Sequence, residues 1–247
     1  MLAKSHSAGL PESMTRQFSP DLFEMMDRPG ADRRVLMDDL KNLRTINRWC
    51  GGLAALRNAV IPLSEAKNGR TPLTFLDLAT GSGDQPVSLV RSFRRSGKKV
   101  HITAVDRNPV MLDAAREYAT GYDEIEFAQE DILHLPYEDA RFDIVTCSLA
   151  IHHLSREDAV RIMREMDRLS CIGFVINDLS RSHVGAASAW IYSRATTHNP
   201  MTRFDSVLSI RRAFKRKELL EIAKEAGTTP IRVYRAPFFR LVAVRQK

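Results

Sequence analysis

The segment LTFLDLATGSGDQP, residues 73–86, begins with an apolar run that ends in the acid Asp77 and continues into two glycines one residue apart. A helical pattern follows from Gln85 to Arg95. This order is typical of a buried parallel strand, a tight turn and a helix whose N-terminus faces a ligand. Glycines also end many strands for purely geometric reasons, so the turn alone is weak evidence. The segment predicts a nucleotide site, and the residues that follow it in the sequence indicate which kind of nucleotide the site binds.

Polar residues also follow three later strand-like runs. The run 100–105 ends in Asp106, the run 125–128 leads to Asp131, and the run 142–147 opens into Ser148 and the pair His152-His153. Because the carboxyl ends of parallel strands meet at one edge of a sheet, these groups are expected to converge on one crevice.

The rest of the chain continues the alternation of strands and helices. Apolar spacing predicts helices and strands over the following ranges: helices 35–56 (broken at Gly51-Gly52), 155–169, 182–197 and 215–226, and strands 171–176, 231–234 and 239–244. We therefore predict an α/β fold, a Rossmann-like, seven-stranded, mostly parallel sheet with helices on both faces and a helical N-terminal extension.

The order of these motifs resembles class I S-adenosylmethionine-dependent methyltransferases. The first motif of that family is similar to residues 76–83, its second ends in Asp106, its third in Asp131, and its fourth is similar to residues 141–145 with the downstream His-His-Leu. The resemblance covers residues 73–178 well and the remainder more loosely. One departure is Ala79, which stands where the family usually has its first glycine.

The resemblance implies S-adenosyl-L-methionine as cofactor and assigns its contacts. Asp77 and the glycine turn would hold the methionine end, Asp106 the ribose hydroxyls, and Asp131 with Ile132 the adenine. The full cofactor-binding set is Asp77, Ala79, Thr80, Gly81, Gly83, Asp106, Arg107, Asp131, Ile132 and Ser148. From the residues alone, Asp106 could instead cap the helix 109–119, and Asp131 could be a turn acid. A nicotinamide site is disfavoured because Pro86 occupies the third glycine position of the dinucleotide fingerprint.

The paired histidines His152 and His153 are the predicted catalytic residues. They follow the fourth strand, and one of them could act as a general base near neutral pH. The alternative is that they cap the loop or pack under it and take no part in the reaction. No metal is expected, because Cys147 and Ser148 supply no acid at the end of that strand.

A small hydrophobic or aromatic acceptor is the predicted substrate, methylated on oxygen or carbon. Trp190, Ile191, Tyr192 and Phe204 lie in the region expected to cover the site, and the chain is similar to quinone-biosynthetic and natural-product methyltransferases of secondary metabolism. Two alternatives stay open. An RNA methyltransferase would use the basic clusters 91–99 and 211–217 to grip phosphates, and a noncatalytic interaction module would keep only the fold.

Domain organisation and location follow from length and composition. We expect a lead-in and helical layer over residues 1–67, with residues 1–20 partly disordered and 68–72 a linker. A methyltransferase domain over 68–247 would carry an acceptor-covering helical insert near 181–214. The chain has 247 residues, a net charge of +7 and three widely spaced cysteines. No apolar run approaches the roughly 18 residues that span a bilayer, so we expect a cytoplasmic protein, and nucleic acid is not required to explain its charge.

Overall fold

The computed structural model describes residues 14–19, 21–28, 30–67 and 71–247. The predicted lead-in therefore lies largely outside the described residues, and so does most of the predicted linker. Residues 14–19, which the structure does describe, are ordered against the rest of the protein: the Arg16 guanidinium donates to the backbone oxygens of His152, Leu154 and Arg212. This part of the lead-in is packed, and the prediction of partial disorder is not tested for residues 1–13, which lie outside the described residues.

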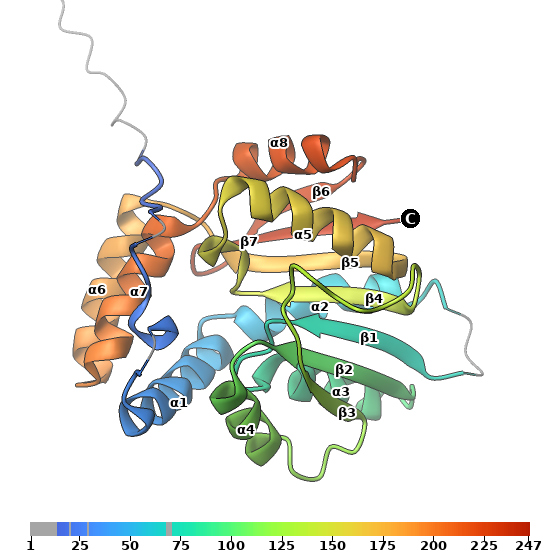
Figure 1. Cartoon of the computed structure of the whole chain (residues 1–247), viewed down its shortest axis with the longest axis horizontal. Helices are drawn as coiled ribbons and strands as arrows, with labels where there is room; N and C mark the ends of the chain where they lie inside the picture. The colour runs from blue at the N-terminus through green and yellow to red at the C-terminus, as the bar shows by residue number, and fades with distance from the viewer. Residues whose placement is uncertain (1–13, 20, 29, 68–70) are drawn as a thin grey trace, which may run out of the picture.

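A seven-stranded sheet forms the centre of the molecule, in the order β3-β2-β1-β4-β5-β7-β6 (Figure 1). Strands β1 to β5 are parallel, whereas β7 runs antiparallel to both β5 and β6. This arrangement confirms the predicted mostly parallel sheet. The strands are β1 Leu73–Leu78, β2 Val100–Asp106, β3 Ile125–Gln129, β4 Phe142–Ser148, β5 Ser170–Leu179, β6 Arg232–Ala236 and β7 Arg240–Gln246.

Helices cover both faces of this sheet. On one face α2 (Gly52–Ser64) and α3 (Asp84–Arg95) bury their apolar sides against alternate residues of β1, β2 and β4. On the other face α5 (Arg156–Leu169) and α8 (Arg216–Ala226) pack on the intervening residues. Helix α4 (Pro109–Tyr118) contacts β2 and β3. Burial on both faces explains why the central strands are almost continuously apolar.

A cap of helices lies beyond the carboxyl ends of the parallel strands (Figure 1). It consists of the 3₁₀ turn η1 (Met25–Asp27), α1 (Arg33–Trp49), α6 (His183–Thr196) and α7 (Pro200–Arg212). Polar side chains join α1 to the insert: Asn42 Nδ2 donates to Thr197 and Thr202, and the Thr202 hydroxyl donates to Asp39 at 2.5 Å. We call this assembly of N-terminal and inserted helices the cap.

The predicted division at residue 68 separates α2 from the sheet that it covers. Leu56, Val60 and Leu63 of α2 are buried in the same cluster as Phe75 and Val90. The predicted helix 35–56 is indeed interrupted at Gly51, whose φ of 72° ends α1, but the second helix continues to Ser64. The N-terminal helices thus belong to two layers: α1 to the cap, and α2 to the sheet.

Ala79 carries backbone strain at the turn after β1. Its φ is +52°, a conformation that costs an L-residue roughly 1–2 kcal/mol. We expect Ala79→Gly to raise the free energy of unfolding by about 0.5–1 kcal/mol, after the greater freedom of glycine in the unfolded chain is subtracted. Urea denaturation measures the change.

Ala140→Gly is the matched control, because Ala140 has the same conformation, φ +53°, at an exposed turn. Both variants should be stabilised if strain dominates. A loss of stability confined to Ala79→Gly would show that the contacts of the Ala79 methyl with the core outweigh the strain.

Candidate active site

The turns after β1 and β2 hold one another in place. The Thr80 amide donates to the Val105 oxygen, and the Gly81 amide donates to Asp106 Oδ2 at 2.9 Å. Asp106 Oδ1 accepts from the Asn108 amide at 2.9 Å. Asn108, and not Asp106, caps α4. The helix-cap alternative for Asp106 is therefore wrong, and its buried carboxylate braces the glycine turn.

A cavity of about 720 Å³ lies between these strand ends and the cap. Its volume is within the range of about 300–1,000 Å³ that is common for small-molecule sites. All the predicted site residues except Gly83 line it. Gly83 instead supports the turn, at φ +75°, because a side chain there would press on Ala115 of α4. The structure thus brings the sequence-predicted residues together, while their individual roles stay predictions.

Asp77 is fully buried at the floor of this cavity. Its carboxylate accepts from the Thr146 hydroxyl at 2.7 Å, and burial raises its pKa to about 6. A carboxylate kept this far from water at a strand end is costly to the fold, which is common at functional sites.

Two further buried side chains on the cavity wall have unmet hydrogen-bonding capacity. Neither the amide group of Gln85 nor the hydroxyl of Ser148 has a partner among the described residues, although both side chains are more than nine-tenths buried. Buried polar groups normally have hydrogen-bond partners. A polar ligand in the cavity would supply partners for these two side chains.

Asp131 and Arg107 form the open side of the cavity. Asp131 Oδ1 accepts from the Leu133 amide at 3.0 Å, which is the turn geometry considered as an alternative, yet the side chain also lines the cavity. Its pKa is lowered, chiefly by this backbone hydrogen bond. Arg107 faces Asp27 at 3.8 Å and is largely exposed. A turn role and a ligand role are thus compatible at Asp131.

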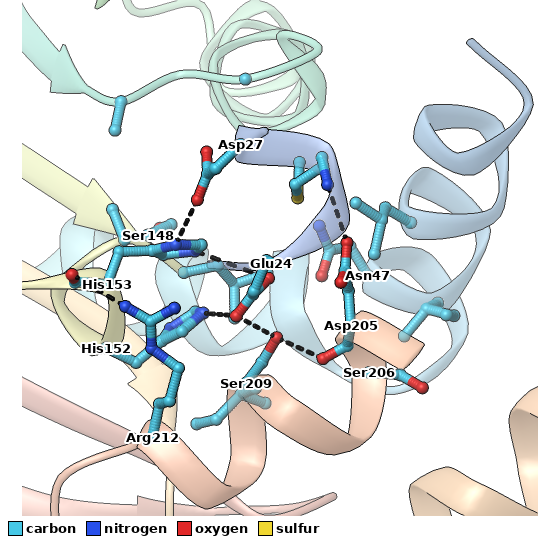
Figure 2. A pocket seen from close by; sticks show the side chains of 18 of the residues that line it. Glu24, Asp27, Asn47, Ser148, His152, His153, Asp205, Ser206, Ser209 and Arg212 are labelled. Carbon is cyan, nitrogen blue, oxygen red and sulfur yellow. Dashed lines mark hydrogen bonds and ion pairs between the residues drawn. The ribbon is translucent and has the colours of Figure 1, made fainter. Parts of the chain in front are cut away.

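The two histidines stand at the other end of the cavity, each between carboxylates (Figure 2). His152 Nδ1 lies 2.7 Å from Asp178 Oδ1, and His153 Nδ1 lies 2.8 Å from Asp27 Oδ2. Both Nε2 atoms face Glu24, at 3.4 Å from His152 and 3.8 Å from His153. The rings stack with centroids 4.2 Å apart. Three carboxylates therefore surround the pair.

These surroundings bear on the predicted general-base role. Although burial disfavours its charged form, the carboxylates of Asp178 and Glu24 raise the pKa of His152 to about 10. An imidazole in this state already holds its proton near neutral pH. His153 is more accessible, with 23% of its side chain exposed. This protonation state argues against proton abstraction by His152 and for a positioning role.

Glu24 is a site residue that sequence reasoning missed. Its side chain is 2% exposed, and its Oε1 accepts from the Ser209 hydroxyl at 2.8 Å. The turn that carries it is fastened to α7, because the Asp205 carboxylate accepts from the amides of Met25 and Met26. No local sequence pattern indicates that Glu24 and Asp27 are site residues. The packing of η1 on α7 brings them to the histidines.

Apolar side chains of the cap line the rest of the cavity, but mostly not those predicted. Trp190, Ile191 and Phe204 are 40–61% exposed and lie outside this cavity, so the expectation that they cover the site is wrong. Tyr192 does line it. The further apolar lining comes from Phe18, Phe23, Leu40, Leu43, Ile46, Trp49, Ile210, Phe238 and Phe239.

Comparisons with known proteins agree with this fold. Residues 75–171 match the family described as a methyltransferase domain. The ubiquinone/menaquinone biosynthesis C-methyltransferase UbiE of Brucella anthropi is 34% identical over 180 residues, which are 68% of this chain and 63% of that protein. A demethylmenaquinone methyltransferase of Deinococcus radiodurans is 37% identical over 100 residues, 40% of this chain and 39% of that protein. The chain thus spans less than two thirds of the length of these relatives.

Solved structures show the same architecture. A SAM-dependent methyltransferase from Aquifex aeolicus aligns with a TM-score of 0.57 at 19% identity, over 85% of this chain and 97% of that one. The CurJ carbon methyltransferase aligns with a TM-score of 0.62 at 13% identity, over 85% of this chain and 59% of that one.

The fold and the cavity define a Rossmann-like methyltransferase architecture. The chain contains a class I S-adenosylmethionine-dependent methyltransferase domain, and S-adenosylmethionine is the cofactor of this class. Within the described residues, no helix has the length and apolar character to cross a membrane. A cytoplasmic location stays a prediction.

Asp77 provides a test of the balance between stability and binding. The folded carboxyl keeps its proton up to about pH 6, whereas an unfolded aspartate loses it near 3.9. The free energy of unfolding should therefore fall as pH rises through this window and stay lowered above it. We expect Asp77→Asn to stabilise the protein, by on the order of 1–3 kcal/mol at pH 8 and by less at pH 5, and to weaken S-adenosylmethionine binding.

Thermal melts at the two pH values and calorimetric titration with the cofactor measure both effects. Asp143→Asn is the control: Asp143 of β4 pairs with Lys67, which lies between α2 and β1, so loss of this pair should destabilise the protein at both pH values. A lower melting temperature for Asp77→Asn at pH 8 would contradict the assignment of a destabilising charge.

Proposed function

We propose that this protein transfers a methyl group from S-adenosylmethionine to carbon or oxygen of a small, quinone-like aromatic acceptor. The observation that carries the proposal is one continuous cavity with the glycine turn and Asp106 at one end and a histidine–carboxylate cluster at the other. The named quinone methyltransferases among its relatives support the acceptor class.

The residues at the strand ends fit the cofactor. Gln85 and Ser148 offer buried polar atoms that lack partners among the described residues, and the Asp106 carboxylate stands at the end of β2, where ribose hydroxyls are bound in this class of sheet. S-adenosylmethionine supplies an electrophilic methyl group on a sulfonium. The residues Asp77, Ala79, Thr80, Gly81, Asp106, Arg107, Asp131, Ile132 and Ser148 would hold it, with Gly83 shaping the turn.

The cap fits a flat apolar acceptor. Aromatic side chains from four segments far apart in the sequence, Phe18 and Phe23, Trp49, Tyr192, and Phe238 with Phe239, line the same cavity. Such a wall excludes water and orients a ring, and positioning supplies much of the rate in a displacement reaction. The acceptor class is therefore a property of the cap.

The histidine–carboxylate cluster gives this apolar space one polar end. A ring hydroxyl of the acceptor placed there would donate electron density to the ring as its proton is drawn toward His153 or Glu24. The methyl carbon would form its new bond to the oxygen or to a ring carbon while its bond to the sulfonium sulfur breaks; the neutral thioether would leave, and the acceptor would lose one proton. We propose that His152 and His153 act at this hydroxyl, with Asp178 and Asp27 fixing their rings.

Transfer of labelled methyl to a short-chain, reduced quinone that lacks a ring methyl group tests the proposal. We expect labelled product from the unmodified protein, and mass fragmentation separates ring methylation from ether formation. Asp106→Ala should lose cofactor binding. His153→Ala should bind the cofactor normally and transfer methyl at least about 100-fold more slowly.

His101→Ala is the matched control, because His101 is half-exposed on β2 and lines no part of the cavity. Its activity should be unchanged. Label appearing in RNA of a cell extract, and not in the organic-soluble fraction, would overturn the acceptor class. Equal cofactor binding by Asp106→Ala and the unmodified protein would overturn the site.

A further inference from the structure

We propose that Glu24, His152 and His153 bind a divalent transition-metal ion at the polar end of the cavity. Each of the three residues offers one ligand atom, and these atoms all lie within 4.8 Å of one another. All three residues line the cavity. The sequence-based expectation of no metal rested on the lack of paired cysteines and of an acid at the end of β4, whereas the carboxylate that completes this set belongs to Glu24, the residue before η1.

The spacing of the ligand atoms fits a shared ion better than direct ion pairs. On their Nδ1 sides the two histidines approach carboxylates to 2.7 and 2.8 Å, the distance of charge-assisted hydrogen bonds. On their Nε2 sides the two histidines face different oxygens of Glu24: His152 lies 3.4 Å from Oε1, and His153 lies 3.8 Å from Oε2. Two ligand atoms that each lie about 2.1 Å from a tetrahedral metal are about 3.4 Å apart.

The surroundings of the two rings match those of metal-bound histidines. A histidine ligand usually donates its second ring N–H to a carboxylate, which sets the tautomer and directs the other nitrogen to the metal. Asp178 does this for His152, and Asp27 for His153. Figure 2 shows Asp27 and Glu24 both facing the His153 ring, and Glu24 facing His152 as well.

The donor set indicates which metals would bind. Two imidazole nitrogens with one carboxylate suit Zn²⁺, Fe²⁺ or Co²⁺, whereas Mg²⁺ and Ca²⁺ prefer oxygen ligands. Three protein ligands leave a coordination position open, as catalytic sites do. In a step that rests on the proposed function, the acceptor hydroxyl would take this position, and the ion would favour its deprotonated form. With the metal bound, the hydroxyl proton would pass to water, because His153 and Glu24 would be occupied as ligands.

Metal binding by the full-length protein, freed of metal with a chelator, tests the proposal without methyl transfer. We expect one equivalent of Co²⁺ to bind with a visible d–d absorption band, and Zn²⁺ to displace it. Glu24→Gln and His153→Ala should each weaken Co²⁺ binding by at least about 100-fold, and Asp27→Asn by roughly 10-fold as an outer-shell change.

His101→Ala is the matched control for adventitious binding, because His101 also faces a carboxylate, Glu126 at 3.6 Å, but on the surface. It should bind Co²⁺ as the unmodified protein does. Circular dichroism melts check that each variant is folded. If His153→Ala does not fold, the conservative Glu24→Gln variant still tests the site.

Two results would overturn the metal site: no Co²⁺ or Zn²⁺ binding by the unmodified protein, or Co²⁺ binding by Glu24→Gln and His153→Ala as tight as that of the unmodified protein. Cofactor binding is titrated in the same metal-free samples. S-adenosylmethionine binding and quinone methylation without metal binding would leave the proposed function standing and remove the metal. Metal binding without cofactor binding would do the reverse.

Discussion

The buried carboxylate of Glu24 is the constraint on which the site depends. A carboxylate with 2% of its surface exposed destabilises the fold unless neighbouring cations or hydrogen-bond donors compensate for its burial. Its partners come from two places: the histidines after β4, and Ser209 of α7. The pKa of Glu24 is lowered by these neighbours despite its burial. By satisfying this one group, the protein ties its N-terminal segment, its sheet and its insert together.

The same contacts explain why the cap closes over the strand ends. Asp205 accepts from two amides of η1, while the guanidinium of Arg212 donates to the backbone oxygens of Leu22 and His153. Asn42, Asp39 and Thr202 repeat this cross-linking between α1 and α7. The cap is thus held by directional polar contacts together with a buried apolar cluster that joins α1, α4 and α7 through Leu40, Met111 and Met201.

The sheet and the cofactor turn could be predicted from sequence because their signals are local. Buried parallel strands give apolar runs, and Gly81, Gly83 and Asp106 stand at positions set by the turn geometry itself. Helix α7 gives no such signal: residues on several of its sides, from Met201 and Asp205 to Arg212, are buried among η1, α1 and α6, so it lacks a single apolar stripe. The prediction that Trp190 and Ile191 of α6 cover the site was wrong for the same reason: both side chains are on the outside of the helix and exposed.

The family match covers one part of the candidate site and leaves out another. The matched domain, residues 75–171, contains the glycine turn, Asp106, Asp131 and the histidine pair. It excludes Glu24, Asp27 and Asp178, the three carboxylates that surround those histidines. The residues predicted to hold the cofactor therefore lie within the matched domain, whereas the carboxylates at the polar end come from Glu24, from η1 and from the end of β5. Two proteins could share the domain and the His-His pair and still differ in acceptor or metal, because the groups that set the state of the imidazoles lie outside the shared segment.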